Sequence, residues 1–112
     1  MGEEQQNLET IMGLIINGGN AKSDAMEAIR AAKKGQFDEA DQKLKDADAA
    51  LGEAHKSQTG MLTKEASGDP VAVSLLMVHG QDHLMNAITF RDLAAEVVDV
   101  YKKMAGVEFS ED

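Results

Sequence analysis

Apolar residues recur along the chain at spacings of three and four, which is the period of an α-helix that buries one face. Nothing alternates with the period of two that a half-buried strand requires, and only short pieces such as residues 71–73 are rich in β-branched side chains. Three stripes follow the helical period: Leu8, Ile11, Ile15, Gly18, Ala21, Ala25, Ala28 and Ala32; Phe37, Ala40, Leu44, Ala47, Leu51, Ala54, Gln58 and Met61; and Val73, Leu76, Gly80, His83, Ala87, Phe90, Ala94, Val97, Tyr101 and Met104. The pattern predicts an all-α protein of three helices.

Two short segments separate the predicted helices. Two lysines and a glycine at residues 33–35 are typical of a helix C-terminus, where cations favour the last turn and glycine adopts the left-handed cap. Residues 67–70 indicate a stop followed by a start, with Asp69 as N-cap and Pro70 in the first helical position. Because short connections make neighbouring helices antiparallel, we expect an up-down-up bundle. The expected bounds within one domain, residues 1–112, are about 5–34, 36–66 and 70–105, with a frayed tail at 106–112.

The predicted third helix is apolar on more than one face. A three-helix bundle buries one face of each helix, so a second apolar face needs another partner surface, and self-association is the simplest one. The second line has the same spacing and is flanked by further apolar residues: Leu75, Val78, Asp82, Met85 and Thr89, with Met77, Leu84, Ile88 and Val98 beside them. In the predicted first helix, Gly18 and Gly19 coincide with a slip in the spacing of the stripe, and we expect either a kink or the close approach of a neighbouring helix there.

Composition narrows the function classes. The chain has 112 residues, of which 20 are acidic and 11 basic, so its net charge is −9. That charge argues against a nucleic-acid or anionic-membrane partner. The chain contains no cysteine, which excludes disulfides, thiolate catalysis and zinc–thiolate sites. No apolar run approaches the roughly 20 residues of a membrane span, and the first residues are polar and acidic, unlike a signal peptide, so the expected location is the cytoplasm.

Candidate chemistry is concentrated in residues 78–85, which contain two of the three histidines in the chain. His79 and His83 are four residues apart and share a helix face, and Asp82 is adjacent to His79 in angle. Gly80 removes a side chain next to His79, which should expose the imidazole. Gln81 points to another part of the helix surface, where it could meet a neighbour.

Three interpretations of the histidine pair stay open. His79 and His83 could hold a structural metal with a third ligand, although Gly80 stands where zinc proteases have a glutamate. They could be packing histidines at a helix interface. A histidine could also be a phosphoryl-accepting nucleophile, because a neutral imidazole has a free nitrogen lone pair near pH 7. Spacing alone does not select among the three.

Asp82 interrupts an otherwise apolar line between Val78 and Met85. A buried carboxylate must be paired, protonated or metal-bound. If this line faces a symmetry axis, copies of Asp82 would crowd together and repel unless a cation or proton lies among them. An aspartate at the edge of an interface, in contact with water, is the equally favoured alternative.

Three segments together resemble a known family: residues 12–21 (MGLIINGGNA), 53–59 (EAHKSQT) and 78–85 (VHGQDHLM). From about Leu8 to Met104, the chain resembles the lactose/cellobiose-type enzyme IIA component of the bacterial sugar phosphotransferase system. The resemblance implies a cytoplasmic homotrimer of three-helix subunits, a nine-helix assembly. It also implies a phosphoryl relay without an organic cofactor, in which the phosphocarrier protein HPr donates to a histidine that passes the group to a cysteine of enzyme IIB.

The resemblance also implies roles for individual residues. His79 matches the phosphorylated histidine, and Gln81 and His83 match flanking positions that help to orient it or bind the phosphoryl group. Asp82 matches an aspartate on the trimer axis that shares a divalent metal, expected to be Mg²⁺, with its symmetry mates. His55 and Gln58 match the second-helix motif, with no clear role. The family usually has alanine at the position of Gly80, and glycine there should weaken the helix by up to ~1 kcal/mol.

Two other functions remain as alternatives. Residues 28–40 resemble the helical hairpins of tetratricopeptide-type domains, which favours a protein-interaction module without catalytic activity, but no 34-residue period repeats the pattern. A metal-dependent hydrolase is the third candidate. Uptake of a phosphoryl group on His79 distinguishes the relay from both.

Overall fold

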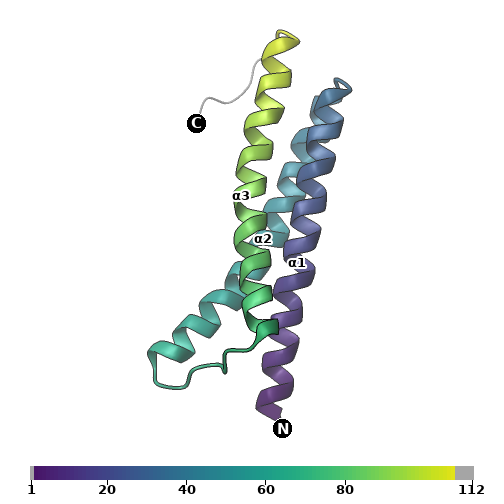
Figure 1. The fold of residues 1–112 in the computed structure, drawn as a ribbon. Helices are drawn as coiled ribbons and strands as arrows, with labels where there is room; N and C mark the ends of the chain where they lie inside the picture. The colour runs from purple at the N-terminus through teal and green to yellow at the C-terminus, as the bar shows by residue number, and fades with distance from the viewer. Residues whose placement is uncertain (1, 108–112) are drawn as a thin grey trace.

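The computed structural model describes residues 2–107, apart from the side chains of residues 3 and 4. These residues form three α-helices and no strand: α1 (Gly2–Lys33), α2 (Phe37–Ala66) and α3 (Leu75–Met104). The helices run up, down and up, which confirms the predicted antiparallel order (Figure 1). None of the helices in this part of the chain is long and apolar enough to cross a bilayer.

The predicted ends of α1 and α2 are confirmed. Gly35 follows α1 with a φ of 79°, and the N–H of Gln36 donates to the carbonyl of Ala31 at 2.9 Å. Gly68 follows α2 with a φ of 89°. Glycine is favoured at both positions because it adopts the left-handed conformation without the steric cost of a Cβ.

The predicted tail at 106–112 lies mostly outside the described residues. Of the part that is described, Gly106 has a φ of 75°, and the N–H of Val107 donates to the carbonyl of Lys102 at 2.8 Å. These two residues therefore cap α3 instead of fraying from it.

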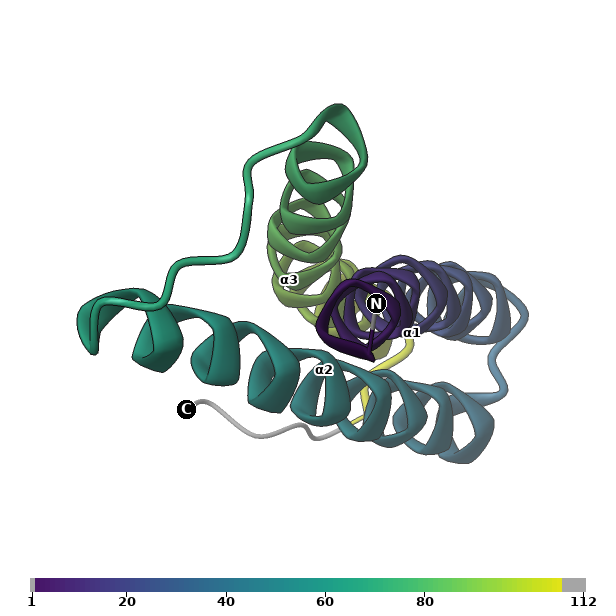
Figure 2. The ribbon, with the colours of Figure 1, turned by 90° about the horizontal axis from the view of Figure 1, so that it is seen from below.

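The predicted start of α3 is wrong by five residues. The helix begins at Leu75, and its N-cap is Ser74, whose side chain accepts a hydrogen bond from the N–H of Met77 at 3.1 Å. Pro70 and the residues up to Ser74 are not helical, and half-buried Val71 packs against the core. The end of α2 and the start of α3 lie apart (Figures 1 and 2). Non-helical chain spans that gap better, because an extended residue covers about 3.3 Å and a helical residue about 1.5 Å.

Helix α1 is the central element of the bundle. It packs along both α2 and α3, whereas α2 and α3 touch each other much less and diverge toward the connection between them (Figure 2). The core has a large-residue region at this diverging end, a middle layer of alanines, and an alanine-rich region at the other end. Its fully buried large side chains are Leu14, Leu84 and Val98. Small side chains in the middle let the helices approach closely, and longer ones fill the wider end.

The predicted stripe of α3 is correct in part, because its members Gly80, Ala87 and Ala94 are buried. Leu76 and Met104 of the stripe are exposed, whereas Met77 and Leu84 outside it are buried. The stripes predicted for α1 and α2 are largely correct, although Leu14 is fully buried and Leu8 is exposed. Periodicity is ambiguous for α3 because apolar residues surround it, and its register was decided by packing against α1.

Polar pairs connect α2 to its neighbours. Lys102 is 8% exposed, and its Nζ lies 2.8 Å from Asp41 Oδ1; Arg91 Nη2 donates to Asp48 Oδ2 at 2.9 Å. On the α1 side, Lys43 Nζ lies 2.9 Å from Glu27, and this hydrogen bond raises the pKa of Lys43. Burial raises the pKa of the nearby Asp24 carboxyl, which Lys43 partly offsets. These pairs therefore join α2 to α3 and to α1 at the edges of the apolar core.

Candidate functional site

The two histidines of residues 78–85 lie side by side on α3. The ring centroids of His79 and His83 are 5.4 Å apart, and the ring planes are tilted by 35°. His79 is exposed, and His83 is half-buried. The arrangement presents one accessible imidazole to an incoming group and a second, more constrained imidazole next to it.

Glycines of α1 lie directly against His83. A Cβ built on Gly18 would lie 3.3 Å from His83 Cδ2 and 3.4 Å from its carbonyl oxygen, and one on Gly19 would lie 3.5 Å from His83 Nε2. Helix α1 continues unbroken through both glycines. Of the two expectations for this pair, the close approach of a neighbouring helix is confirmed.

Gly80 lies on the core side of α3. A Cβ there would lie 3.3 Å from Ile11 Cγ2 and 3.6 Å from Leu14 Cδ1, so this glycine faces α1. We expected the missing side chain of Gly80 to expose the His79 imidazole, and this expectation is wrong. Successive helical residues are about 100° apart, so residue 80 faces the core while residue 79 does not. His79 is exposed because of its own position on the helix.

Gln81 points toward α2. Gln58 Nε2 donates to Gln81 Oε1 at 2.7 Å, and the Gln81 amide also contacts the sulfur atoms of Met61 at 3.5 Å and Met77 at 3.8 Å. Within the subunit, Gln81 thus joins α3 to α2, on a different side of the helix from His79. Gln58, whose role the sequence left open, is its partner, while His55 is exposed on α2.

Asp82 is exposed on the outward face of α3, between two apolar side chains that are also half exposed, Val78 and Met85. Among the described side chains, those of residue 2 and residues 5–107, no three from His, Cys, Asp or Glu gather as a metal site would require. His79 and His83 therefore have no third ligand among these residues. One carboxylate per chain fits a shared oxygen-ligand site only where several copies meet.

A hollow of about 520 Å³ borders His83 between α1 and α3. Besides Gly19 and Phe90, it is lined by five residues that have no role in the sequence-based predictions: Lys22, Ser23, Met26, Glu27 and Arg30. Lys22 and Arg30 lie on α1, far from His79 in the chain. The available signal was that Gly19, Lys22, Met26 and Arg30 follow one another at spacings of three and four along one face of α1.

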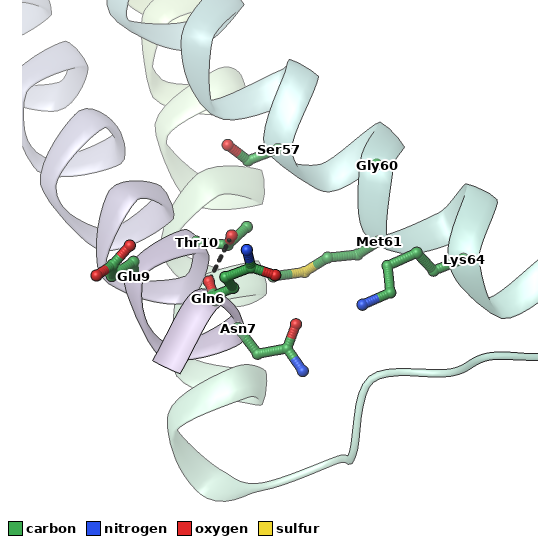
Figure 3. A pocket seen from close by; sticks show the side chains of 8 residues that line it. All are labelled: Gln6, Asn7, Glu9, Thr10, Ser57, Gly60, Met61 and Lys64. Carbon is green, nitrogen blue, oxygen red and sulfur yellow. Dashed lines mark hydrogen bonds between the residues drawn. The ribbon is translucent and has the colours of Figure 1, made fainter. Parts of the chain in front are cut away.

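A second hollow of similar volume lies between the start of α1 and the end of α2 (Figure 3). Its lining is mainly polar: Gln6, Asn7, Glu9, Thr10, Ser57, Gly60, Met61 and Lys64. Thr10 Oγ1 donates to the carbonyl of Gln6 at 2.9 Å (Figure 3). None of the predicted site residues lines it, so the histidine pair remains the candidate site.

Comparison with known proteins agrees with this geometry. Residues 9–102 match the family described as PTS system, Lactose/Cellobiose specific IIA subunit. The lichenan-specific phosphotransferase enzyme IIA component of Bacillus subtilis is 49% identical over 104 residues, which cover 93% of each chain. The galactose-specific EIIA component of Lactococcus lactis subsp. cremoris is 51% identical over 98 residues, covering 88% of this chain and 84% of the relative.

Solved structures show the same fold. The PTS cellobiose-specific enzyme IIA from Bacillus anthracis superimposes with a TM-score of 0.86 at 48% identity, covering 88% of this chain and 90% of that one. The IIA(chitobiose)–HPr complex of the Escherichia coli phosphotransferase system contains a chain with a TM-score of 0.76 at 39% identity, covering 87% of this chain and 94% of that one. The chain therefore belongs to the lactose/cellobiose-specific IIA family, a component of phosphotransferase systems.

Proposed function

We propose that this chain is a phosphoryl carrier in which His79 accepts a phosphoryl group from HPr and passes it to a cysteine of an enzyme IIB during sugar uptake. The observation that carries the proposal is the exposed His79 imidazole, next to His83, in a chain of this family. A solved relative in complex with HPr supports the choice of donor. A helical interaction module would need no such pair of imidazoles.

The transfer consists of two in-line displacements. In the first, the unprotonated ring nitrogen of His79 attacks the phosphorus, a nitrogen–phosphorus bond forms, and the bond between the donor and phosphorus breaks. In the second, the enzyme IIB thiolate attacks, a sulfur–phosphorus bond forms, and His79 regains its lone pair. The chain supplies position and hydrogen bonds for both steps.

His83 and Gln81 support His79 in different ways. The His83 ring lies close enough for a ring N–H to donate to an oxygen of a phosphoryl group on His79. Gln81 accepts a hydrogen bond from Gln58 of α2, and this bond holds α2 against α3. Lys22 borders the same hollow as His83 and supplies positive charge on this side of the site.

A homotrimer completes the proposed assembly. Large apolar side chains are exposed along the outward face of α3, including Leu75 at 86%, Val78 at 52% and Leu93 at 60%. Packing three copies of this face around an axis would remove that surface from water. The three Asp82 carboxylates would then approach one another and share a divalent cation, with Mg²⁺ the expected ion, which would neutralise their repulsion.

Incubation of the purified chain with phosphorylated HPr tests the relay. We expect the intact mass at neutral pH to increase by one acid-labile phosphoryl group, located on His79 by fragmentation. His79→Ala should abolish the gain and keep the helical circular-dichroism signal. Addition of enzyme IIB should remove the group, whereas enzyme IIB without its cysteine should not.

His55→Ala is the matched control, because His55 is the remaining histidine and is exposed on α2. This variant should gain the phosphoryl group as the wild type does. Uptake by His79→Ala, or no uptake by the wild type, would refute the proposal.

A further inference from the structure

We propose that Gly18 and Gly19 of α1 form a seat for the His83 imidazole and act as positioning residues: they orient the His83 ring, whose N–H donates to the phosphoryl group on His79. This inference rests on the proposed function. It names a role for a glycine pair that the helix itself does not need, since glycine at a helix interior position lowers stability by ~1 kcal/mol relative to alanine.

Both glycines lie against the imidazole ring of His83. A Cβ on Gly18 would lie 3.3 Å from His83 Cδ2, which is tighter than an ordinary contact, and a Cβ on Gly19 would lie 3.5 Å from His83 Nε2, which is an ordinary contact. Gly18 is buried, and the neighbouring core position on α3, Leu84, is fully buried. The imidazole of His83 is thus held between the backbone of α1 and the surface of its own helix.

The other glycines of α1 do not share this environment. A Cβ on Gly13 would meet nothing within 4 Å, although Gly13 lies in the same helix. The contacts at residues 18 and 19 therefore belong to the place where α1 meets His83, and Gly13 offers a control with the same chemical change.

The seat matters because His83 must present its N–H in one direction. The rings of His79 and His83 are 5.4 Å apart, and a hydrogen bond weakens steeply when its angle is distorted. The Cβ of an alanine at residue 18 would lie 3.3 Å from His83 Cδ2, which is tighter than an ordinary contact, and 3.4 Å from the His83 carbonyl oxygen, so the imidazole ring must shift by a few tenths of an ångström. Displacements of about 1 Å near a reacting group can cost about 100-fold in rate, and a shift of a few tenths of an ångström should cost about 3- to 10-fold.

A graded set of glycine-to-alanine variants tests the seat. Gly13→Ala should leave both the His83 ring signals in ¹⁵N-edited NMR spectra and the rate of phosphoryl uptake unchanged. Gly19→Ala should shift the ring signals slightly, and Gly18→Ala should shift them most and slow uptake by about 3- to 10-fold.

A double-mutant cycle separates a role through His83 from simple helix packing. In a His83→Ala background, Gly18→Ala should slow uptake by less than about twofold, because no ring remains to be displaced. The same slowing in both backgrounds, or unchanged His83 signals in Gly18→Ala, would overturn the inference. If the wild type takes up no phosphoryl group, the proposed function fails, and the ring signals alone then decide whether the seat exists.

Discussion

At Gly80, helix propensity and side-chain packing have opposite effects on the stability of the protein. Alanine there would gain up to ~1 kcal/mol of helix propensity. Its Cβ would also lie 3.3 Å from Ile11 Cγ2, which is tighter than ordinary contact. The crowded atom is a side-chain methyl group, so a small adjustment of Ile11 can relieve the contact.

We therefore expect Gly80→Ala to raise the free energy of unfolding by less than ~1 kcal/mol, whereas Gly80→Val, with two further carbons against Ile11 and Leu14, should lower it by about 1–3 kcal/mol. Denaturant unfolding at one protein concentration measures both changes. Phosphoryl uptake by Gly80→Ala should match the wild type, because residue 80 faces the core. A less stable Gly80→Ala would mean that the contact with Ile11 outweighs helix propensity.

Part of the candidate site could be predicted from the sequence alone. The spacing of His79 and His83 placed them correctly on one helix face, because helix geometry is local. The glycine seat and the Gln58–Gln81 hydrogen bond join residues 65 and 23 positions apart in the chain. Periodicity carries no information about which helices touch at those positions.

At the scale of the element, the beginning of α3 depends on the path between helices. Asp69 and Pro70 are a favourable N-cap pair by local preference, yet Ser74 caps the helix. The divergence of α2 from α3 requires the intervening residues to leave the helix, and Val71 gains burial by doing so.

Replacement of Ser74 by alanine should lower the free energy of unfolding by about 1 kcal/mol, because the N–H of Met77 loses its partner. Asp69→Ala is the matched control and should cost clearly less, since Asp69 caps no helix and its carboxylate lies 4.0 Å from Lys64. Chemical denaturation of both variants measures the difference. A larger loss for Asp69→Ala would support the helix start predicted from the sequence.

At the scale of the whole molecule, the exposed outward face of α3 is the feature that a single subunit leaves unexplained. Helix α1 covers one side of α3, and α2 touches it only in part. Leu75, Val78 and Leu93 remain in contact with water on the other side. A trimer that buries them would also make Asp82 the main electrostatic cost of assembly.

Sedimentation should give the mass of a trimer for the wild type and of a monomer for Val78→Glu, which places a charge on this face. Leu62→Glu is the control, because it makes the same kind of change at an exposed leucine of α2 (60% exposed), and this variant should remain trimeric. Mg²⁺ should raise the melting temperature of the wild type relative to EDTA, and Asp82→Asn should abolish that difference. A monomeric wild type, or equal disruption by Leu62→Glu, would contradict the trimer.

Helix number, order and most ends were determined by the sequence itself, because they follow from local periodicity and from cap residues such as Gly35. The resemblance carried by residues 12–21, 53–59 and 78–85 together was also sufficient to indicate the family. Tertiary structure alone decided the register of α3, its start at Leu75, the seat under His83 and the direction of Gln81. These features depend on which surfaces meet across helices, and burial at such contacts outweighs the smaller preferences of single residues.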